Sequence, residues 1–434
     1  MARGRDRRRR GGHPARQAER RDRERTRREG ASNPARRAAA AMCAEAQQLD
    51  GPLEAELWAS ALLGSWWPPS LEMVAGRRDP DLELGGPLVD ELKRLGGPGG
   101  LAALLALGEV SETELGVRAL EHVNALLAAG VPRPPWGQAI LEAEVLRTAV
   151  MLEDVFDDGR TIFVEATHGD GGRHAIGVYI DHNLGGIAKD IVLADSLDQV
   201  EELLAANAGE RANPRLEPID PGEAHSRIRA AMELTDMTLE APVSEDYAAL
   251  RALAMLRSDE LAGPFPELST PELSDEAREE LRADFLASPE GERFAADSDA
   301  AFVASLAIDF CADYLDGRPL RWSPATVEVF MVGWVARKVV ADRATFDAVP
   351  GALDAWLRYA GRRRGIPDWA IEESCDAVGA FTGEMLEQVD GDAGGGPARE
   401  LLAAARDAGV DFSDEEAVAT FIAGWNARSG LDER

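Results

Sequence analysis

Cysteine, aromatic residues and long apolar runs are all scarce in this 434-residue sequence. Its three cysteines, Cys43, Cys311 and Cys375, lie far apart without CxxC spacing, which argues against a disulfide framework or a Cys-based zinc site and favours a reducing compartment. Aromatic residues make up 6% of the chain, which argues against a large β-sandwich or barrel. No apolar run is long enough to cross a bilayer, and none follows the basic N-terminus as in a signal peptide. We therefore expect a cytoplasmic protein that does not associate with membranes.

Motifs of common enzyme classes are missing as well. The sequence has no GxSxG nucleophile elbow, no Walker GxxxxGK[ST] motif and no GxGxxG motif between a strand and a helix. Their absence favours a protein that is not an enzyme and that needs no cofactor.

Charge of the two signs is separated along the chain. Residues 1–40 contain fifteen Arg and five acidic residues, a net charge of +10, whereas residues 41–434 carry a net charge of −41. Residues 1–30 have no aliphatic side chain larger than Ala apart from Met1, so the tail cannot bury a core and is predicted to be disordered when free. Arginines from Arg3 to Arg37 supply phosphate contacts without aromatic base readout, which favours non-specific RNA or DNA binding. The alternatives are a solubilising extension or docking on the protein's own acidic surface.

The pattern of apolar residues predicts a mainly α protein with a small α+β part. Four runs rich in Val, Ile, Phe and Tyr lie between about 148 and 194, separated by turn residues such as Asp158-Gly159 and Asn183–Gly186. Turns at spacings near ten residues are typical of an antiparallel meander, here of three or four strands. Helices are predicted on both sides of it, including 136–146, 197–207 and 350–361, while 209–222 is predicted to be a loop.

Helix caps and breakers suggest a domain organisation. Ser111 with Glu114 fits a capping box, and Ser274 is a predicted cap. Either Asp297 or Ser298 is predicted to begin the next helix, and Ser323 precedes Pro324 as a cap before a first-turn proline. The glycine-rich LGGPGG segment at 95–100 is interpreted as a linker. The resulting units are a disordered tail (1–40), a mixed helical domain with the sheet (41–262), a linker (263–273), an all-helical domain (274–390) and a linker with a C-terminal helical pair (391–434).

The strongest polar cluster falls on the meander. Half of the six histidines lie between His168 and His182. His168 and His174 face each other across one tight turn with Asp170 between them, and these residue types are ligands that a divalent metal ion accepts. His174 and His182 share a strand but lie about 26 Å apart at roughly 3.3 Å per residue, too far for one ion. The competing interpretation is ordinary turn chemistry, because Asp, Asn, His and Gly are common in hairpin turns.

Two functional hypotheses follow. The first is an interaction or scaffold protein with a protein partner, associated with RNA or DNA through its tail. The alternative is a metal-dependent hydrolase that uses His168, Asp170 and His174. The Trp66-Trp67-Pro68-Pro69 segment fits either an exposed partner motif or a part of the core. The sequence makes no prediction of the oligomeric state.

Overall fold

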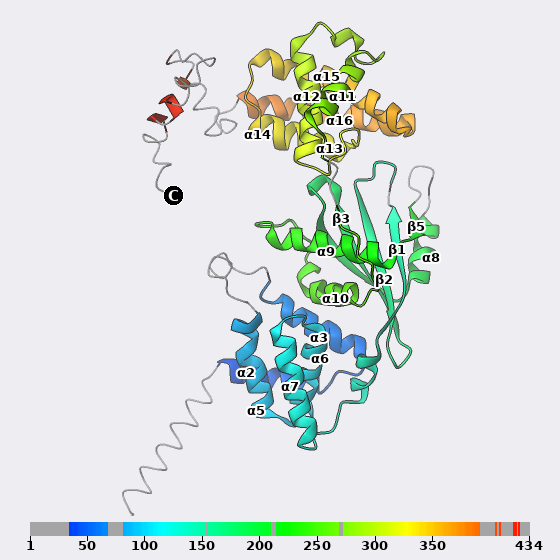
Figure 1. The fold of residues 1–434 in the computed structure, drawn as a ribbon, viewed down its shortest axis with the longest axis vertical. Coiled ribbons are helices and arrows are strands. Elements are labelled where there is room, and N and C mark those ends of the chain that lie inside the picture. The colour runs from blue at the N-terminus through cyan, green and yellow to red at the C-terminus, as the bar shows by residue number, and fades with distance from the viewer. Residues whose placement is uncertain are drawn as a thin grey trace, which may run out of the picture.

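Helices predominate in the computed structural model, and a single antiparallel sheet lies between two groups of helices (Figure 1). The predicted class, mainly α with a small antiparallel β part, is confirmed. The residues described are 34–67, 81–152, 154–207, 209, 214–268 and 272–390, with 404–405, 408, 420–422 and 424–425. Most of the tail (1–33) and nearly all of the C-terminal pair predicted within 391–434 therefore lie outside the described residues.

The N-terminal group contains, among the described residues, the helices α2 (Pro34–Ala46), α3 (Pro52–Gly64), α5 (Gly86–Leu95), α6 (Gly97–Val110) and α7 (Glu114–Ala128). Almost every residue of α6 is buried, so this apolar helix forms the centre of the group. A π-helical turn, η1 (Asp81–Gly85), leads into α5. Helix α2 includes residues 34–40 of the predicted tail, where the alanine run favours a helix and Ala39 is fully buried.

Two expectations for this group are corrected. The LGGPGG segment is not a linker, because it ends α5 and forms the first turn of α6. Its glycines allow close packing: a Cβ at Gly99 would lie 2.2 Å from the carbonyl oxygen of Cys43 in α2. Thr113 rather than Ser111 caps α7, since its hydroxyl accepts from the Leu115 N–H at 3.3 Å and Glu114 is the first helical residue.

The sheet among the described residues contains five strands, whereas three or four were predicted. Its strands are β1 (Glu144–Leu152), β2 (Gly159–Thr167), β3 (Arg173–Asp181), β4 (Ile187–Ala194) and β5 (Arg215–Pro218), in the order β4-β3-β2-β1-β5 with every pair antiparallel. Strand β5 lies in the predicted 209–222 loop and pairs with the free edge of β1. The helix predicted at 136–146 is instead two 3₁₀ turns, η2 (Pro135–Gly137) and η3 (Ala139–Glu142), followed by β1, because pairing with β2 begins at Glu144.

Helices cover both faces of this sheet. Inward-facing residues such as Ile162, Val164 and Val178 pack in one core with residues of α9 (Pro221–Met237) and α10 (Tyr247–Asp259). On the opposite face, Phe163 packs with α8 (Leu197–Asn207), which has the predicted bounds. A short 3₁₀ turn, η4 (His182–Leu184), joins β3 to β4.

The C-terminal group is all helical over the described residues 275–390. It comprises α11 (Asp275–Leu286), η5 (Glu292–Phe294), α12 (Ser298–Asp313), α13 (Pro324–Glu328), the π-helical segment η6 (Val329–Val335), α14 (Ala336–Lys338), α15 (Arg343–Arg364) and α16 (Asp368–Asp390). Ser274 and Ser323 cap α11 and α13 as predicted, and of the two candidates for α12 the cap is Asp297 rather than Ser298. Helix α15 begins seven residues before Pro350, where Asp342 provides the cap, so the helix predicted at 350–361 is longer at both ends.

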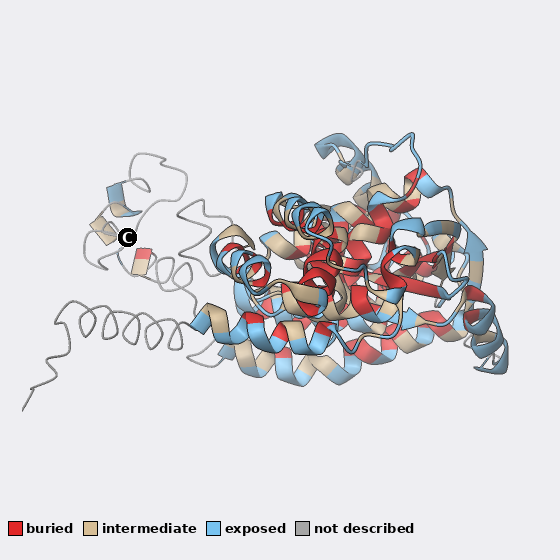
Figure 2. Ribbon diagram, turned by 90° about the horizontal axis from the view of Figure 1, so that it is seen from below, coloured by how far each residue is buried: buried red, intermediate tan, exposed pale blue. Residues whose placement is uncertain are grey.

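Burial follows this arrangement. Buried residues fill the space between the elements, whereas the outer helix faces are exposed (Figure 2). Within the described ranges, no helix combines the length and the apolar character that crossing a bilayer requires.

Candidate functional site

The polar residues predicted as a site are divided between the two ends of strand β3. His168, after β2, and His174, in β3, lie with their ring centroids 5.0 Å apart. Asp170 is exposed in the turn between them, where its Oδ1 accepts a hydrogen bond from the Gly172 N–H at 2.9 Å. The structure thus brings the two histidines together, whereas the carboxylate of Asp170 bonds only within the turn as described. Residues 181–183 lie at the other end of β3.

Two residues that the sequence analysis did not select complete the group around the stacked histidines. This His174 cluster consists of Glu56 from α3, His168, His174 and Arg257 from α10. Glu56 Oε2 lies 3.0 Å from His168 Nε2, Arg257 Nε donates to His174 Nε2 at 2.9 Å, and Arg257 Nη2 donates to Glu56. None of the four is more than 3% exposed. The cluster is therefore closed to solvent.

Electrostatics in the cluster favour one buried ion pair beside a neutral histidine. Burial, assisted by the positive charge of Arg257, lowers the pKa of His174 to about 3. Burial acts to raise the pKa of Glu56, but the hydrogen bond from His168 and the charge of Arg257 outweigh it and hold this pKa below its usual range. Because His174 Nε2 accepts from Arg257, its proton resides on Nδ1, which is buried and has no hydrogen-bond partner within the described part of the chain.

A metal ion has little to bind here. In the part of the chain that the structure describes, no three His, Cys, Asp or Glu side chains are placed to hold one. In the His174 cluster, the guanidinium of Arg257 already occupies His174 Nε2 and places a positive charge where the ion would be. His168 and His174 instead contact the buried ion pair between Glu56 and Arg257.

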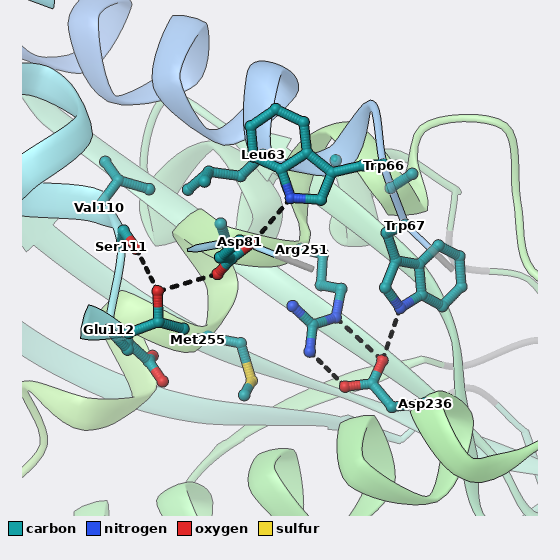
Figure 3. A pocket seen from close by; sticks show the side chains of 14 residues that line it. Leu63, Trp66, Trp67, Asp81, Val110, Ser111, Glu112, Asp236, Arg251 and Met255 are labelled. Carbon is teal, nitrogen blue, oxygen red and sulfur yellow. Dashed lines mark hydrogen bonds and ion pairs between the residues drawn. The ribbon is translucent and has the colours of Figure 1, made fainter. Parts of the chain in front are cut away.

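An open pocket with a different chemistry lies nearby. This two-tryptophan pocket has a volume of about 260 Å³ and lies between α3, α10, the start of η1 and the turn after α6 (Figure 3). Its lining is Leu63, Gly64, Trp66, Trp67, Asp81, Val110, Ser111, Glu112, Thr113, Asp236, Ala248, Arg251, Ala252 and Met255. Trp66 and Trp67 are both half-buried, which lies between the two interpretations offered for them from the sequence.

Small residues place the tryptophans by letting α3 approach α10 closely. A Cβ on Gly64 would lie 2.0 Å from the carbonyl oxygen of Ala248, so only glycine fits at this crossing. Four residues earlier in α3, Ser60 Oγ donates to the Ala249 carbonyl at 2.6 Å and accepts from the Leu253 N–H at 3.1 Å. These contacts fix the end of α3, and Trp66 and Trp67 follow directly.

Carboxylates then orient both indoles. Trp66 Nε1 donates to Asp81 Oδ1 and Trp67 Nε1 donates to Asp236 Oδ1, each at 2.7 Å. Asp236 also accepts two hydrogen bonds from Arg251, one of them from Nε at 3.0 Å (Figure 3). With their donors engaged, the two side chains present apolar ring surface at defined positions.

The remaining polar lining is acidic. Asp81 accepts a second hydrogen bond from Thr113 Oγ1 at 3.0 Å. Glu112 lies 2.9 Å from Arg229, yet burial raises its pKa above the usual range in spite of that partner. Among the described residues of the lining there are three carboxylates and one guanidinium, and no His, Cys or Lys.

Sequence reasoning missed most of these residues for identifiable reasons. Glu56 occupies a helical position among Ala55, Ala59 and Leu63, all buried, so a carboxylate on an apolar face was a readable signal. Arg257 lies 201 residues away from Glu56, and nothing in the sequence connects the two. The same holds for Asp236 and Trp67, which are 169 residues apart.

Comparisons with models of protein families, with curated protein sequences and with solved structures give no match to this chain. A functional assignment therefore depends on the geometry of its own residues.

Proposed function

We propose that this protein is an interaction protein, a helical scaffold that holds a group of its partner in the two-tryptophan pocket. The main support for this proposal is a cavity of about 260 Å³ with two adjacent indoles, each oriented by a carboxylate. Preorganised aromatic side chains are typical binding anchors, because few rotamers are lost when a ligand arrives.

The pocket suits a cationic side chain with an apolar stem. Trp66 and Trp67 offer faces that attract a cation, and Leu63 and Met255 offer apolar contacts for the stem. Three carboxylates against one arginine in the lining add a negative potential. Residues 41–434 carry a net charge of −41, which also draws a basic partner and repels an anionic one.

A titration of the full chain with acetyl-arginine amide tests this proposal, with acetyl-citrulline amide as the uncharged ligand of similar shape. We expect the arginine ligand to bind at least about tenfold more tightly, as one desolvated cation–π contact allows. Ala252→Phe, which fills the pocket, abolishes binding, and Glu112→Gln weakens it. Ala205→Phe, on the exposed face of α8, is the matched control. Equal binding of the two ligands, or full binding by a folded Ala252→Phe variant, would rule the proposal out.

A second part of the proposal concerns the basic segment from Arg3 to Arg37, which we assign to non-specific association with RNA or DNA. Its support is the separation of charge, +10 over residues 1–40 against −41 over the rest. A cytoplasmic location belongs to the same proposal, and the free state of Cys43, Cys311 and Cys375 is consistent with it.

Removal of residues 1–33 tests the nucleic-acid part separately. We expect the full chain to bind single-stranded RNA and to lose about 10³-fold or more in affinity between 50 and 200 mM salt, as for six or more phosphate contacts. The truncated chain, which keeps all of α2, loses both the affinity and the salt dependence. Unchanged RNA binding after truncation would contradict this assignment, and absence of binding by either form would favour docking on the protein's own acidic surface.

A further inference from the structure

A second cleft lies where the sheet meets the C-terminal helices. It has a volume of about 490 Å³ and is bordered by the end of β3, the face of α9 and the loop before α13. Its polar lining consists of Arg160, His182, Arg227, Asp316 and Arg318, with Gly185 and Gly186 at the backbone. Clefts between packed units are common ligand sites.

Arginine is the most frequent charged residue in the lining of this cleft. Three guanidinium groups line it against the carboxylate of Asp316, in a body whose net charge is −41. Arg318 is held in place by hydrogen bonds to Asp157 and Asp316. It therefore forms a fixed wall of the cleft.

The other two arginines keep part of their donor capacity. Arg227 directs Nε and Nη2 to Glu223, both at 2.8 Å, so one side of its planar fork is occupied. Arg160 directs Nη2 to Asp157 at 3.1 Å, and its Nε is buried with no hydrogen-bond partner among the described residues. An unsatisfied buried donor costs free energy, and an acceptor from a ligand would recover it.

Backbone conformation at the cleft is also unusual. Asp157, which contacts both Arg160 and Arg318, has a φ of 60°, a left-handed conformation that is uncommon for a residue other than glycine. Gly185 and Gly186 have φ values of 76° and 89°. A Cβ on Gly186 would meet nothing within 4 Å, so open space adjoins the backbone there. Strained residues of this kind cluster at ligand sites.

We infer that this cleft binds the phosphate group of a small phosphomonoester, with Arg160 and Arg227 as donors and Arg318 as a fixed positive wall. Guanidinium forks match the tetrahedral oxygens of phosphate and bind them in pairs. Asp316 is the one carboxylate among the described lining residues, and it accepts hydrogen bonds from Arg318 and Arg321. This site is separate from the two-tryptophan pocket and does not depend on its function.

Calorimetric titration of the full chain, at constant ionic strength, tests the inference. The probes are inorganic phosphate and ribose 5-phosphate, with chloride as the reference anion. Arg227→Gln removes a donor from α9, and Arg215→Gln is the matched control, because Arg215 is 62% exposed on β5 and lies outside the cleft. Arg227→Lys keeps the positive charge but lacks the planar guanidinium that donates paired hydrogen bonds.

We expect phosphate to bind, ribose 5-phosphate to bind more tightly, and Arg227→Gln to weaken both about tenfold while Arg215→Gln stays within about twofold. Arg227→Lys recovers part of the loss. Arg160→Gln is the second variant, with a loss of the same size in a chain that keeps its far-ultraviolet circular dichroism. Equal effects of Arg227→Gln and Arg215→Gln, or no binding by the wild-type chain at 10 mM of either probe (about 100 times a Kd of 0.1 mM), would overturn the inference.

Discussion

His174 and His182 lie at opposite ends of the same strand, β3, and the two ends differ in what surrounds them. At the first end, the partners come from α3 and α10, and the whole His174 cluster is at most 3% exposed. At the second end, the partners come from the loop before α13: Arg318 Nη2 lies 2.9 Å from His182 Nδ1, and the Arg318 side chain is 35% exposed. One end is closed and the other borders a cleft.

The comparison shows that residue type alone does not decide whether a polar cluster is closed to solvent or open to it. Both ends combine histidine, carboxylate and arginine, and both resemble a site in the sequence. The surroundings of each histidine depend on partners that are distant in the sequence. Glu56 lies 112 residues from His168, and Arg318 lies 136 residues from His182. Arg257 at the first end is fully buried, whereas the Arg318 side chain at the second end is partly exposed.

The largest loss of stability is expected when the buried ion pair of the His174 cluster is broken. Arg257→Met leaves the carboxylate of Glu56, 1% exposed, without its buried counter-charge and should lower the free energy of unfolding by about 3–5 kcal/mol. Urea denaturation followed by circular dichroism measures this loss. The double variant Glu56→Leu with Arg257→Met removes both charges and should recover at least half of it. A single variant within about 1 kcal/mol of the wild type would show that water reaches the cluster.

A smaller loss of stability is expected when a buried arginine at the other end of β3, Arg321, is replaced by methionine. Arg321 is 1% exposed and bonds Asp316 Oδ2 at 2.8 Å, Asn183 Oδ1 at 2.8 Å and the His182 carbonyl at 3.0 Å. The Asp316 side chain is 14% exposed, so water compensates part of its charge when the arginine is removed. Arg321→Met should therefore cost about 2–3 kcal/mol in the same urea assay. A loss as large as that of Arg257→Met would remove the distinction between the two ends.

The lowered pKa of His174 should make the stability of the protein depend on pH. The pKa of His174 is about 3 in the folded chain and about 6.5 when unfolded, so between these values the unfolded state binds one proton more. Stability therefore falls as pH falls from 6.5, by up to about 1.4 kcal/mol per pH unit from this residue. His174→Gln, whose amide oxygen can still accept from Arg257, should remove that part of the slope between pH 5 and 6.5. Identical slopes for the two proteins would indicate that His174 is protonated in the folded chain.

Local sequence signals predicted the elements whose causes are local. The caps Ser274, Asp297 and Ser323 each accept from a backbone N–H within three residues, and their residue types made that visible. The runs rich in β-branched and aromatic residues, separated by turn residues, likewise predicted the antiparallel meander.

Elements with distant causes were missed. Strand β5 is four residues, RLEP, without a β-branched side chain, and it exists because β1 offers a free edge. The glycines of LGGPGG resemble a linker until α2 is packed against them. The sequence also placed His168, Asp170 and His174 correctly on one hairpin, but Glu56 and Arg257 reach the two histidines from segments that no local pattern connects to it.

The smallest effect is expected from metal removal, which tests the metal-dependent hydrolase hypothesis directly. His174 Nε2 is held 2.9 Å from the guanidinium of Arg257, and Asp170 bonds its own turn, so an ion would have to displace a buried cation before it could bind. Purified protein should therefore contain no stoichiometric zinc, manganese or iron by elemental analysis. Dialysis against EDTA should leave the melting temperature unchanged within about 1 °C, less than a bound structural ion would contribute. One metal ion per chain that disappears in His168→Ala would instead make the closed end of β3 the functional one, because Arg257 would then have moved aside for the ion.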